Sequence, residues 1–413
     1  MDAPSGVVSK GYLDGTHRLR NPAETLALIE PHLPAMGITR VANITGLDRL
    51  GIPVVAVYRP NARSIVVSQG KGVNLVAARV SGLMEAIESF HAEHADLPLR
   101  LSSFKELQQS YAVIDVTRLP HLSVSNFHSE KPLLWCEARN LLTEKPIWVP
   151  YEMVHTNYTR PLPAGSGNFV MSSNGLASGN HYLEAVCHGL CEVVERDALA
   201  LWALDGGTKC RDRRLDLASV DAASAKTLIQ TLFDADMAVG VWEITTDIGL
   251  PAFVCALVDQ RPNAFSQFYS SHGSGCHLSR EVALLRALTE AAQTRLTYIA
   301  GARDDAHREL FETARNPDRI ADVRADIGED APVMRQWSGV PHHETSSFDA
   351  DLSIILQGLQ SAGVSEVAAL EFPARMPGIS VIRVIVPGLE GLHDAPGYVP
   401  GRRAEGHVRG GRR

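Results

Sequence analysis

Apolar residues are grouped along this chain in short β-branched runs and in longer amphipathic stretches. The runs 52–58 and 64–68 are separated by Arg59-Pro60-Asn61 and predict a hairpin or two paired strands. The same pattern predicts further strands at 134–138, 239–245, 252–258, 367–372 and 379–386. Because helical and strand patterns are mixed throughout, we expect a mixed α/β fold, built as one large unit or as two to three closely packed subdomains.

The two ends of the chain differ in character. Near the start, Asn21 is a capping residue, Pro22 suits the first helical position and Glu24 completes a capped first turn, so we expect a helix from Pro22 to about Pro34. From Gly388 onward the chain is rich in Gly, Pro and Arg, and its final residues are expected to be mobile.

The amphipathic stretches carry an internal repeat. The segment Gly82-Leu83-Met84-Glu85-Ala86-Ile87-Glu88 recurs at 189–195, and again at 287–293 with glutamine in the last position. Each copy is predicted to be helical, and each follows a glycine-bearing segment that we predict to be a loop, at 70–72, 174–180 and 273–275. Loop and helix therefore repeat together three times.

Each repeated helix presents a pair of polar side chains on one face, because residues three apart in a helix share a face. The pairs are Glu85 with Glu88, Glu192 with Glu195, and Glu290 with Gln293. Such pairs are commonly solvated surface positions, but here apolar or small residues flank them on nearly every side, so solvation would also expose apolar surface. Buried carboxylates require a cation, which favours a shared site over three separate surfaces.

The residue types suit Mg²⁺ held together with a nucleotide. Carboxylate oxygens and substrate phosphates are the ligands that Mg²⁺ prefers. Glycine segments ahead of helices can offer backbone N–H groups to phosphate, and Lys71 and Arg196 supply positive charge. The chain has no G-x-x-x-x-G-K-[ST] segment, so the predicted site is not a P-loop.

Bulk composition narrows the function classes. The chain has 413 residues and a formal net charge of −8, which argues against an extended nucleic-acid-binding surface but leaves a local basic groove open. Met1 to Arg20 lacks the pattern of a secretory signal, and no apolar run approaches the length of a membrane span. The six cysteines include no C-x-x-C pair. We therefore expect a cytoplasmic protein that binds neither nucleic acid nor membrane.

Three further groups of residues have competing interpretations. Cys187 and Cys191 lie one helical turn apart beside His188 and could hold a metal, although small cysteines more often fill helix cores. His272, Cys276 and His277 could form a catalytic Cys/His pair, although the plainer interpretation is incidental loop histidines. Asp304-Asp305 is predicted to be a solvated turn.

The ordered set of motifs resembles the YcaO family from about residue 37 to residue 403. The resemblance rests on Gly70-Lys71-Gly72, Ser81-x-x-x-Glu85-x-x-Glu88, Ser173-Asn174-Gly175-Leu176-Ala177-x-Gly179-Asn180-x-x-x-Glu184, Glu192-x-x-Glu195-Arg196-Asp197 and Arg286-x-x-x-Glu290-x-x-Gln293. It implies a YcaO-type α/β fold in which three loop–helix units converge on an acidic Mg-ATP site. The corresponding division is an N-terminal helical segment (1–36), a YcaO catalytic domain (37–390) and a Gly/Pro/Arg-rich tail (391–413).

The resemblance also assigns roles by position. The implied cofactors are ATP and Mg²⁺. The residues implied to bind them are Ser81, Glu85, Glu88, Asn180, Glu184, Glu192, Glu195, Arg196, Arg286 and Glu290, with Arg18 and Thr25 from the N-terminal segment, and Lys71 joins this set. The metal ligands among them are Glu85, Glu88, Glu184, Glu192, Glu195 and Glu290, and the catalytic residues are Glu85, Glu192, Glu195 and Arg196.

Members of this family convert peptide backbone amides into azolines, thioamides or amidines. This chain lacks the Pro-x-Pro-x-Pro tail common in azoline-forming members, and it is similar to the subgroup that pairs with a TfuA protein and makes thioamides. The implied partners are a peptide or protein substrate, a TfuA-type protein or sulfur donor, and a second copy in a homodimer. Two alternatives stay open: an azoline-forming cyclodehydratase, and a nucleotide-binding, peptide-recognising subunit without chemistry of its own.

Overall fold

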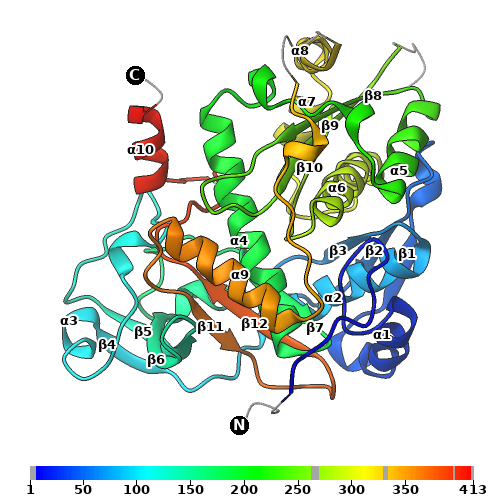
Figure 1. Cartoon of the computed structure of the whole chain (residues 1–413). Coiled ribbons are helices and arrows are strands. Elements are labelled where there is room, and N and C mark those ends of the chain that lie inside the picture. The colour runs from blue at the N-terminus through cyan, green and yellow to red at the C-terminus, as the bar shows by residue number, and fades with distance from the viewer. Residues whose placement is uncertain (1–5, 262–268, 329–333, 394–395, 411–413) are drawn as a thin grey trace.

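The structure, a computed structural model, describes residues 6–261, 269–328, 334–393 and 396–410 (Figure 1). These residues form three antiparallel sheets and three long helices. Figure 1 shows one of these helices, α4 (Tyr182–Leu204), running through the middle of the molecule. The mixed α/β fold predicted from the sequence is confirmed.

All three sheets are antiparallel; two have three strands and one has six. The first has the strand order β1-β2-β3, and the third has the order β10-β9-β8. The second has the order β4-β5-β11-β12-β7, with β6 paired to β5. The strand bounds are β1 Arg40–Asn43, β2 Val54–Tyr58, β3 Val67–Lys71, β4 Arg100–Ser103, β5 Pro132–Asn140, β6 Lys145–Pro150, β7 Leu176–Gly179, β8 Met237–Glu243, β9 Ala252–Asp259, β10 Ser271–Cys276, β11 Ala368–Glu371 and β12 Ser380–Ile385.

One strand at the end of each sheet leads directly into a long helix. Strand β3 precedes α2 (Leu75–Glu93), β7 precedes α4, and β10 precedes α6 (Arg280–Ala300). The unit that repeats three times is therefore a strand followed by a helix. The glycine-bearing segments were predicted to be loops, and this was wrong for much of their length, since Gly70 and Gly273 both lie within strands.

These glycines are required by close packing of the strand on its own helix. A Cβ atom on Gly70 would lie 2.1 Å from the carbonyl oxygen of Ala78 in α2. A Cβ atom on Gly273 would lie 2.1 Å from the backbone nitrogen of Ala291 in α6. Because no side chain fits there, strand and helix backbones approach closely, and the polar residues beside the glycines are brought towards the helix face.

The three units contact one another in a closed cycle. Besides its own strand, α2 contacts β7, α4 contacts β10, and α6 contacts β3. Each unit therefore touches the strand of the next, and the third returns to the first. The helix faces that carry the acid pairs are turned towards a common centre.

Strand β9 shows how two cores are separated. All of its residues are buried, and they alternate between two apolar clusters. Val254 and Ala256 pack in the cluster that contains α4, whereas Phe253 and Cys255 pack in the cluster that contains α6. This explains the unbroken apolar run in the sequence, since both faces of the strand are covered.

The N-terminal helix α1 (Pro22–Ile29) has the predicted capping box, in which Asn21 and Glu24 each accept a bond from the other's backbone N–H. It ends earlier than predicted, because Pro31 has no N–H to continue the helical hydrogen bonds. Two 3-10 turns, Glu30–His32 and Pro34–Met36, follow it. The remaining helices are α3 Phe104–Leu107, α5 Ala223–Asp234, α7 Arg308–Ala314, α8 Pro317–Gly328, α9 Phe348–Ser361 and α10 Arg402–Gly410.

Both chain ends are tied to the body. The buried Lys10 ammonium lies 2.8 Å from Asp351 in α9, which fixes the segment that leads to α1. At the other end, Arg403 in α10 lies 2.9 Å from the fully buried Asp197 of α4. Residues 402–410 form a helix, whereas residues 411–413 lie outside the described residues, so the expected mobility of the final residues stays a prediction.

Candidate functional site

A cavity of about 530 Å³ lies where the three long helices and the N-terminal segment meet. Every side chain that the sequence assigned to the nucleotide or the metal lines it. These are Arg18, Thr25, Lys71, Ser81, Glu85, Glu88, Asn180, Glu184, Glu192, Glu195, Arg196, Arg286 and Glu290. A larger hollow of about 1070 Å³ between α5, α8 and β8 contains none of these residues.

The cavity-facing residues follow one stripe on each helix. On α2, Glu85 and Glu88 are half-buried, while the residues between them, Ala86 and Ile87, are fully buried in the core. On α6, Arg286 and Glu290 are likewise half-buried, while the residues between them are buried. The apolar neighbours of the acid pairs thus anchor the helices, and the acids face the cavity and not bulk solvent.

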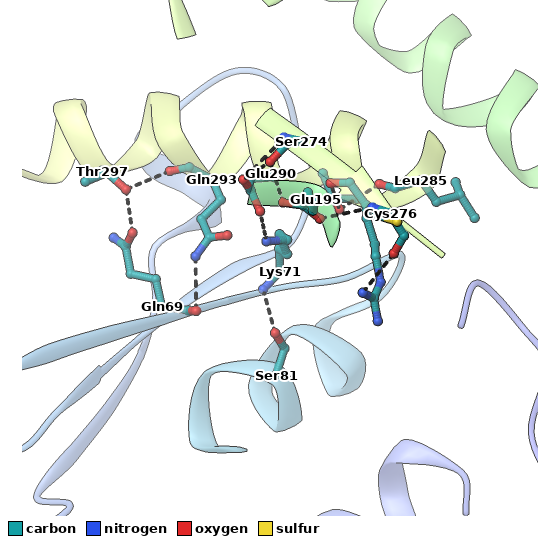
Figure 2. Close-up of polar contacts among 12 residues, drawn as sticks. Gln69, Lys71, Ser81, Glu195, Ser274, Cys276, Leu285, Glu290, Gln293 and Thr297 are labelled. Atoms are coloured by element: carbon teal, nitrogen blue, oxygen red, sulfur yellow. Dashed lines mark hydrogen bonds and ion pairs between the residues drawn. The ribbon is translucent and has the colours of Figure 1, made fainter. Parts of the chain in front are cut away.

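The second polar residue of each pair binds the strand of the next unit. Ser178 in β7 donates to Glu88 at 2.6 Å, and Ser274 in β10 donates to Glu195 at 2.5 Å. In the third unit Gln293 donates to the backbone carbonyl of Gln69 in β3 at 3.0 Å. Figure 2 shows the second and third of these contacts. The glutamine in the third repeat is explained by its partner, because a carbonyl oxygen needs a donor.

In the third pair the first residue, Glu290, lies close to a cation. The Lys71 ammonium is 2.5 Å from Glu290, which also accepts from the Ser274 backbone N–H at 3.2 Å (Figure 2). Burial raises the pKa of Glu290, but Lys71 and Arg196 outweigh this effect and the pKa is lowered. Glu290 is therefore ionised, and Lys71 is its counterion.

Three other carboxyl groups are held towards the protonated form. Burial raises the pKa of Glu88 to about 8, and the Glu192 and Glu85 carboxylates act in the same direction. Burial also raises the pKa of Glu192 to about 7, although Arg196 opposes this. The pKa of Glu85 is raised by burial as well. Burial is the largest cause in each case, so a bound cation would offset the cost of ionising these carboxyl groups, as expected at a cation site.

Five residues close the end of the cavity nearest the N-terminus. The Leu19 backbone N–H donates to Glu184 at 2.8 Å, and the Arg18 guanidinium lies 3.5 Å from the same carboxylate. Asn180 donates to Glu184 at 3.3 Å and accepts from the Thr25 hydroxyl at 3.0 Å. The segment before α1, whose alignment to the family motif is weakest, is therefore joined to the repeat motif by hydrogen bonds.

Sequence reasoning missed several residues of the cavity wall. Arg303, which follows α6, and Arg20 add two cations, and His188 lies on α4 between Glu184 and Glu192. Ser178 and Ser274 were also missed as wall residues. A usable signal existed for the serines, since each stands beside a glycine of the repeated unit, whereas nothing in the sequence marks Arg303.

The donor set fits Mg²⁺ that binds together with phosphate. Among the described residues there is no group of three or more His, Cys, Asp or Glu side chains placed to hold one ion. Mg²⁺ does not require such a cage, because it is usually held by one or two carboxylates while water and substrate phosphates complete its octahedron. The cavity is lined by six glutamates together with Lys71 and several arginines, so it offers carboxylates for the metal and positive charge for the phosphates.

The competing interpretations of the cysteines are decided by burial, and His272, which was expected in a loop, lies in strand β10. Cys187 and Cys191 belong to an apolar core cluster. Cys276 is fully buried, and its pKa is raised well above the usual value by a hydrogen bond with Cys191 and by burial, so it is not a ready nucleophile. Asp304 accepts from the Val66 backbone N–H at 3.0 Å, so the predicted solvated turn also fastens the chain after α6 to the first sheet.

Fold and cavity together define a protein of mixed α/β architecture with a glutamate-lined cavity that is shared by three strand–helix units. Residues 69–390 match a family model described as YcaO cyclodehydratase, ATP- and Mg²⁺-binding. The chain belongs to the YcaO family, and ATP and Mg²⁺ are its cofactors.

Two relatives align over nearly the full chain. A Rhizobium leguminosarum bv. trifolii protein, described as an uncharacterized protein in the tfuA 3′ region, is 36% identical over 407 residues, covering 97% of this chain and 95% of the relative. A protein of Methanothermobacter thermautotrophicus is 34% identical over 389 residues, covering 94% of this chain and 98% of that protein.

Solved structures share the fold. YcaO from Methanopyrus kandleri, bound with AMPPCP and Mg²⁺, matches with a TM-score of 0.71 at 22% identity and covers 93% of this chain and 95% of its own. A heterocyclase in complex with substrate and cofactor matches with a TM-score of 0.80 at 22% identity. That match covers 99% of this chain but 57% of the heterocyclase, so the heterocyclase chain is much longer. No described helix is both long enough and apolar enough to span a membrane.

Proposed function

We propose that this protein uses Mg-ATP to phosphorylate the oxygen of a backbone amide in a peptide or protein, and that the product is a thioamide. The observation that carries the proposal is the single cavity in which three helices present their acid pairs beside Lys71, Arg196 and Arg286. A cluster of glutamates beside several cations suits a metal–polyphosphate ligand better than either component alone.

The chain's own residues have separable tasks. Lys71, Arg196 and Arg286 bind phosphate oxygens. The metal is held through members of the acidic set, namely Glu85, Glu88, Glu184, Glu192, Glu195 and Glu290, while Ser81, Asn180, Arg18 and Thr25 shape the nucleotide pocket. Bound Mg²⁺ supplies neutralisation of the phosphate charge that develops during transfer.

The chemistry follows from the poor leaving ability of an amide oxygen. A nucleophile adds to the amide carbonyl carbon, the resulting oxyanion takes the γ-phosphoryl group of ATP, and the C–O bond then breaks with release of phosphate. With hydrosulfide as nucleophile, the carbon keeps sulfur and the amide oxygen leaves in phosphate. The protein contributes position and charge neutralisation, which the fixed helices are suited to give.

Two observations support sulfur from an external donor. None of the described residues that line the cavity is a cysteine, and the nearest core thiols, Cys191 and Cys276, lie in or beside the packed interior. The Rhizobium relative lies in the tfuA 3′ region, which favours a TfuA-type partner or a sulfur donor acting with this chain. Assembly as a homodimer stays a prediction.

An azoline-forming cyclodehydratase is the second candidate. It is favoured by the family description and by the heterocyclase of similar fold. In that reaction the nucleophile is a Cys, Ser or Thr side chain of the substrate, and the activation of the amide oxygen is the same.

One labelling experiment tests the proposal and separates the two candidates. The protein is incubated with ATP, Mg²⁺, sulfide and a peptide whose backbone amides carry ¹⁸O, with and without a TfuA-type partner. The proposal expects ¹⁸O in inorganic phosphate. In a parallel reaction with the unlabelled peptide it expects a gain of about 16 mass units, from exchange of oxygen for sulfur. Label in phosphate together with a loss of about 18 mass units, as water, from the unlabelled peptide would replace thioamidation by cyclodehydration. Label retained in the peptide while ATP is cleaved would contradict amide phosphorylation itself.

A further inference from the structure

His188 lies on the cavity face of α4 but belongs to none of the acid pairs. It is one helical turn from Glu184 and one turn from Glu192, so the three side chains share a face. The ring is half-buried and lines the cavity, unlike Ala185 and Val186 nearby, which are fully buried. Its exposed surface therefore faces the space that the nucleotide would occupy.

The orientation of the ring is fixed by Arg286. The Arg286 guanidinium lies 3.0 Å from His188 Nδ1 and also donates to the backbone carbonyl of Cys276 at 3.4 Å. A guanidinium only donates hydrogen bonds, so Nδ1 must be the acceptor and cannot carry a proton. The neutral ring then carries its proton on Nε2.

The surroundings keep the ring neutral. Burial lowers the pKa of His188 well below its usual value, and the positive charges of Arg286, Arg18 and Lys71 act in the same direction. Within the part of the chain that the structure describes, no protein group accepts a hydrogen bond from Nε2. His188 therefore offers one N–H donor to whatever occupies the cavity.

We propose that His188 is a catalytic hydrogen-bond donor, and that its Nε2–H binds an anionic oxygen at the reacting centre. This rests on the proposed function, because that function places phosphate and a developing oxyanion in the cavity. Two sources share the required chemistry: an oxygen of the γ-phosphate, or the amide oxygen once the nucleophile has added. The ring is not a general base, because Nε2 already holds a proton and Nδ1 is occupied by Arg286.

A pair of substitutions separates the functions of the two ring nitrogens. In His188→Gln the side-chain amide nitrogen can replace the Nε2–H donor, whereas the acceptor for Arg286 is lost. In His188→Asn the side-chain oxygen can replace Nδ1 as the acceptor for Arg286, whereas the donor is lost. Both changes lie on the cavity wall, so the apolar core of α4 is left intact, and melting temperatures with and without Mg-nucleotide confirm the fold.

The measurement is peptide-dependent ATP turnover, with kcat and both KM values determined for each variant. We expect His188→Gln to stay within about tenfold of the wild-type kcat, and His188→Asn to lose about 100-fold, as when one oxyanion donor is removed. Loss in kcat at saturating ATP assigns the donor to the oxyanion; a raised KM for ATP with kcat retained assigns it to the γ-phosphate.

Two outcomes would overturn the inference. If His188→Asn is as active as the wild type, the histidine only supports Arg286. If both variants lose activity equally, the imidazole itself is needed, as for a base. Failure of the proposed function looks different, since the wild-type protein would then show no peptide-dependent ATP turnover.

Discussion

At the scale of single residues, the acids of the cavity are not equivalent. Glu195 accepts two hydrogen bonds, from the Ser274 hydroxyl and the Cys276 backbone N–H, whereas Glu192 is raised in pKa by burial and by its neighbour Glu195. Both face the same cavity. Glu195 therefore also has a structural role as a hydrogen-bond acceptor, whereas Glu192 is mainly an acid available to bind a cation.

This difference predicts opposite effects on stability. Glu192→Ala removes one like charge and should leave the free energy of unfolding of the metal-free protein unchanged or higher. Glu195→Ala leaves the buried Cys276 backbone N–H without its acceptor and removes one of the two acceptors of the Ser274 hydroxyl, so it should cost about 1–3 kcal/mol. Urea unfolding in EDTA measures both, and ATP turnover should be lost in both. Equal destabilisation by the two changes would contradict the distinction.

The raised pKa values predict how stability depends on pH without metal. An unfolded glutamate titrates near 4.5, whereas Glu88 in the fold titrates at about 8 and Glu192 at about 7. From these two groups the folded chain binds more protons than the unfolded chain. Buried histidines such as His17 and His155, whose pKa is lowered to about 4, have the opposite effect below their ordinary pKa of 6.5, so we expect stability to fall as pH rises from about 6.5 to 8. Melting temperatures in EDTA across this range test the sign.

Glu88→Gln supplies the matching variant for that experiment, because it removes one of the two carboxyl groups whose pKa is raised. In this variant stability should fall less steeply as pH rises. The exposed Glu137 of β5 offers a control, since Glu137→Gln should leave the slope unchanged. A slope that is the same in all three proteins would show that other groups determine it.

At the scale of elements, apolar strands could be predicted and polar ones could not. The runs at 252–258 and 379–386 became β9 and β12 within two residues at each end. Strands β7 and β10 were taken for loops, because Gly and Ser there serve close packing on a helix and not a buried apolar face. Tertiary packing overrode local propensity at the two strands nearest the cavity.

That packing makes a sharp prediction for Gly273. An added methyl group would meet the backbone of α6, which cannot move aside as a flexible side chain could. Gly273→Ala should therefore destabilise the protein by about 3 kcal/mol or prevent its folding. Gly46→Ala is the control, since nothing lies within 4 Å of that position and about 0.5 kcal/mol or less is expected. Similar unfolding curves for the two variants would contradict the close strand–helix contact.

The candidate site was more predictable than the elements that carry it. Repetition of the acid pairs along the chain is enough to identify all three helix faces, and the cavity contains every assigned residue. The sequence could not show which hydrogen bonds join the three helix faces to one another. The contacts of Glu88 with Ser178 and of Glu195 with Ser274 cross from one unit to the next, and no local pattern encodes such partners.

At the scale of the whole molecule, one ligand should report on all three units. On the proposed function, Mg²⁺ with a non-hydrolysable ATP analogue should contact the faces of α2, α4 and α6 at once. At 100 times its Kd the ligand should stabilise the protein by about 2.7 kcal/mol. Hydrogen exchange should slow in all three helices together. Protection confined to one helix would contradict a shared site, and Glu137→Gln should respond as the wild type does.

The closed cycle of units also determines when the site can exist. The bond that completes it joins Gln69 to Gln293, which are 224 positions apart in the chain. During synthesis on the ribosome, α2 and α4 emerge with their acidic faces long before the third unit is made, and domains generally gain their structure as units. A nascent chain that ends before α6 has neither Glu290 nor the contact that holds β3 beside it. We therefore expect the capacity to bind Mg-ATP to appear late and all at once, as translation passes the end of α6.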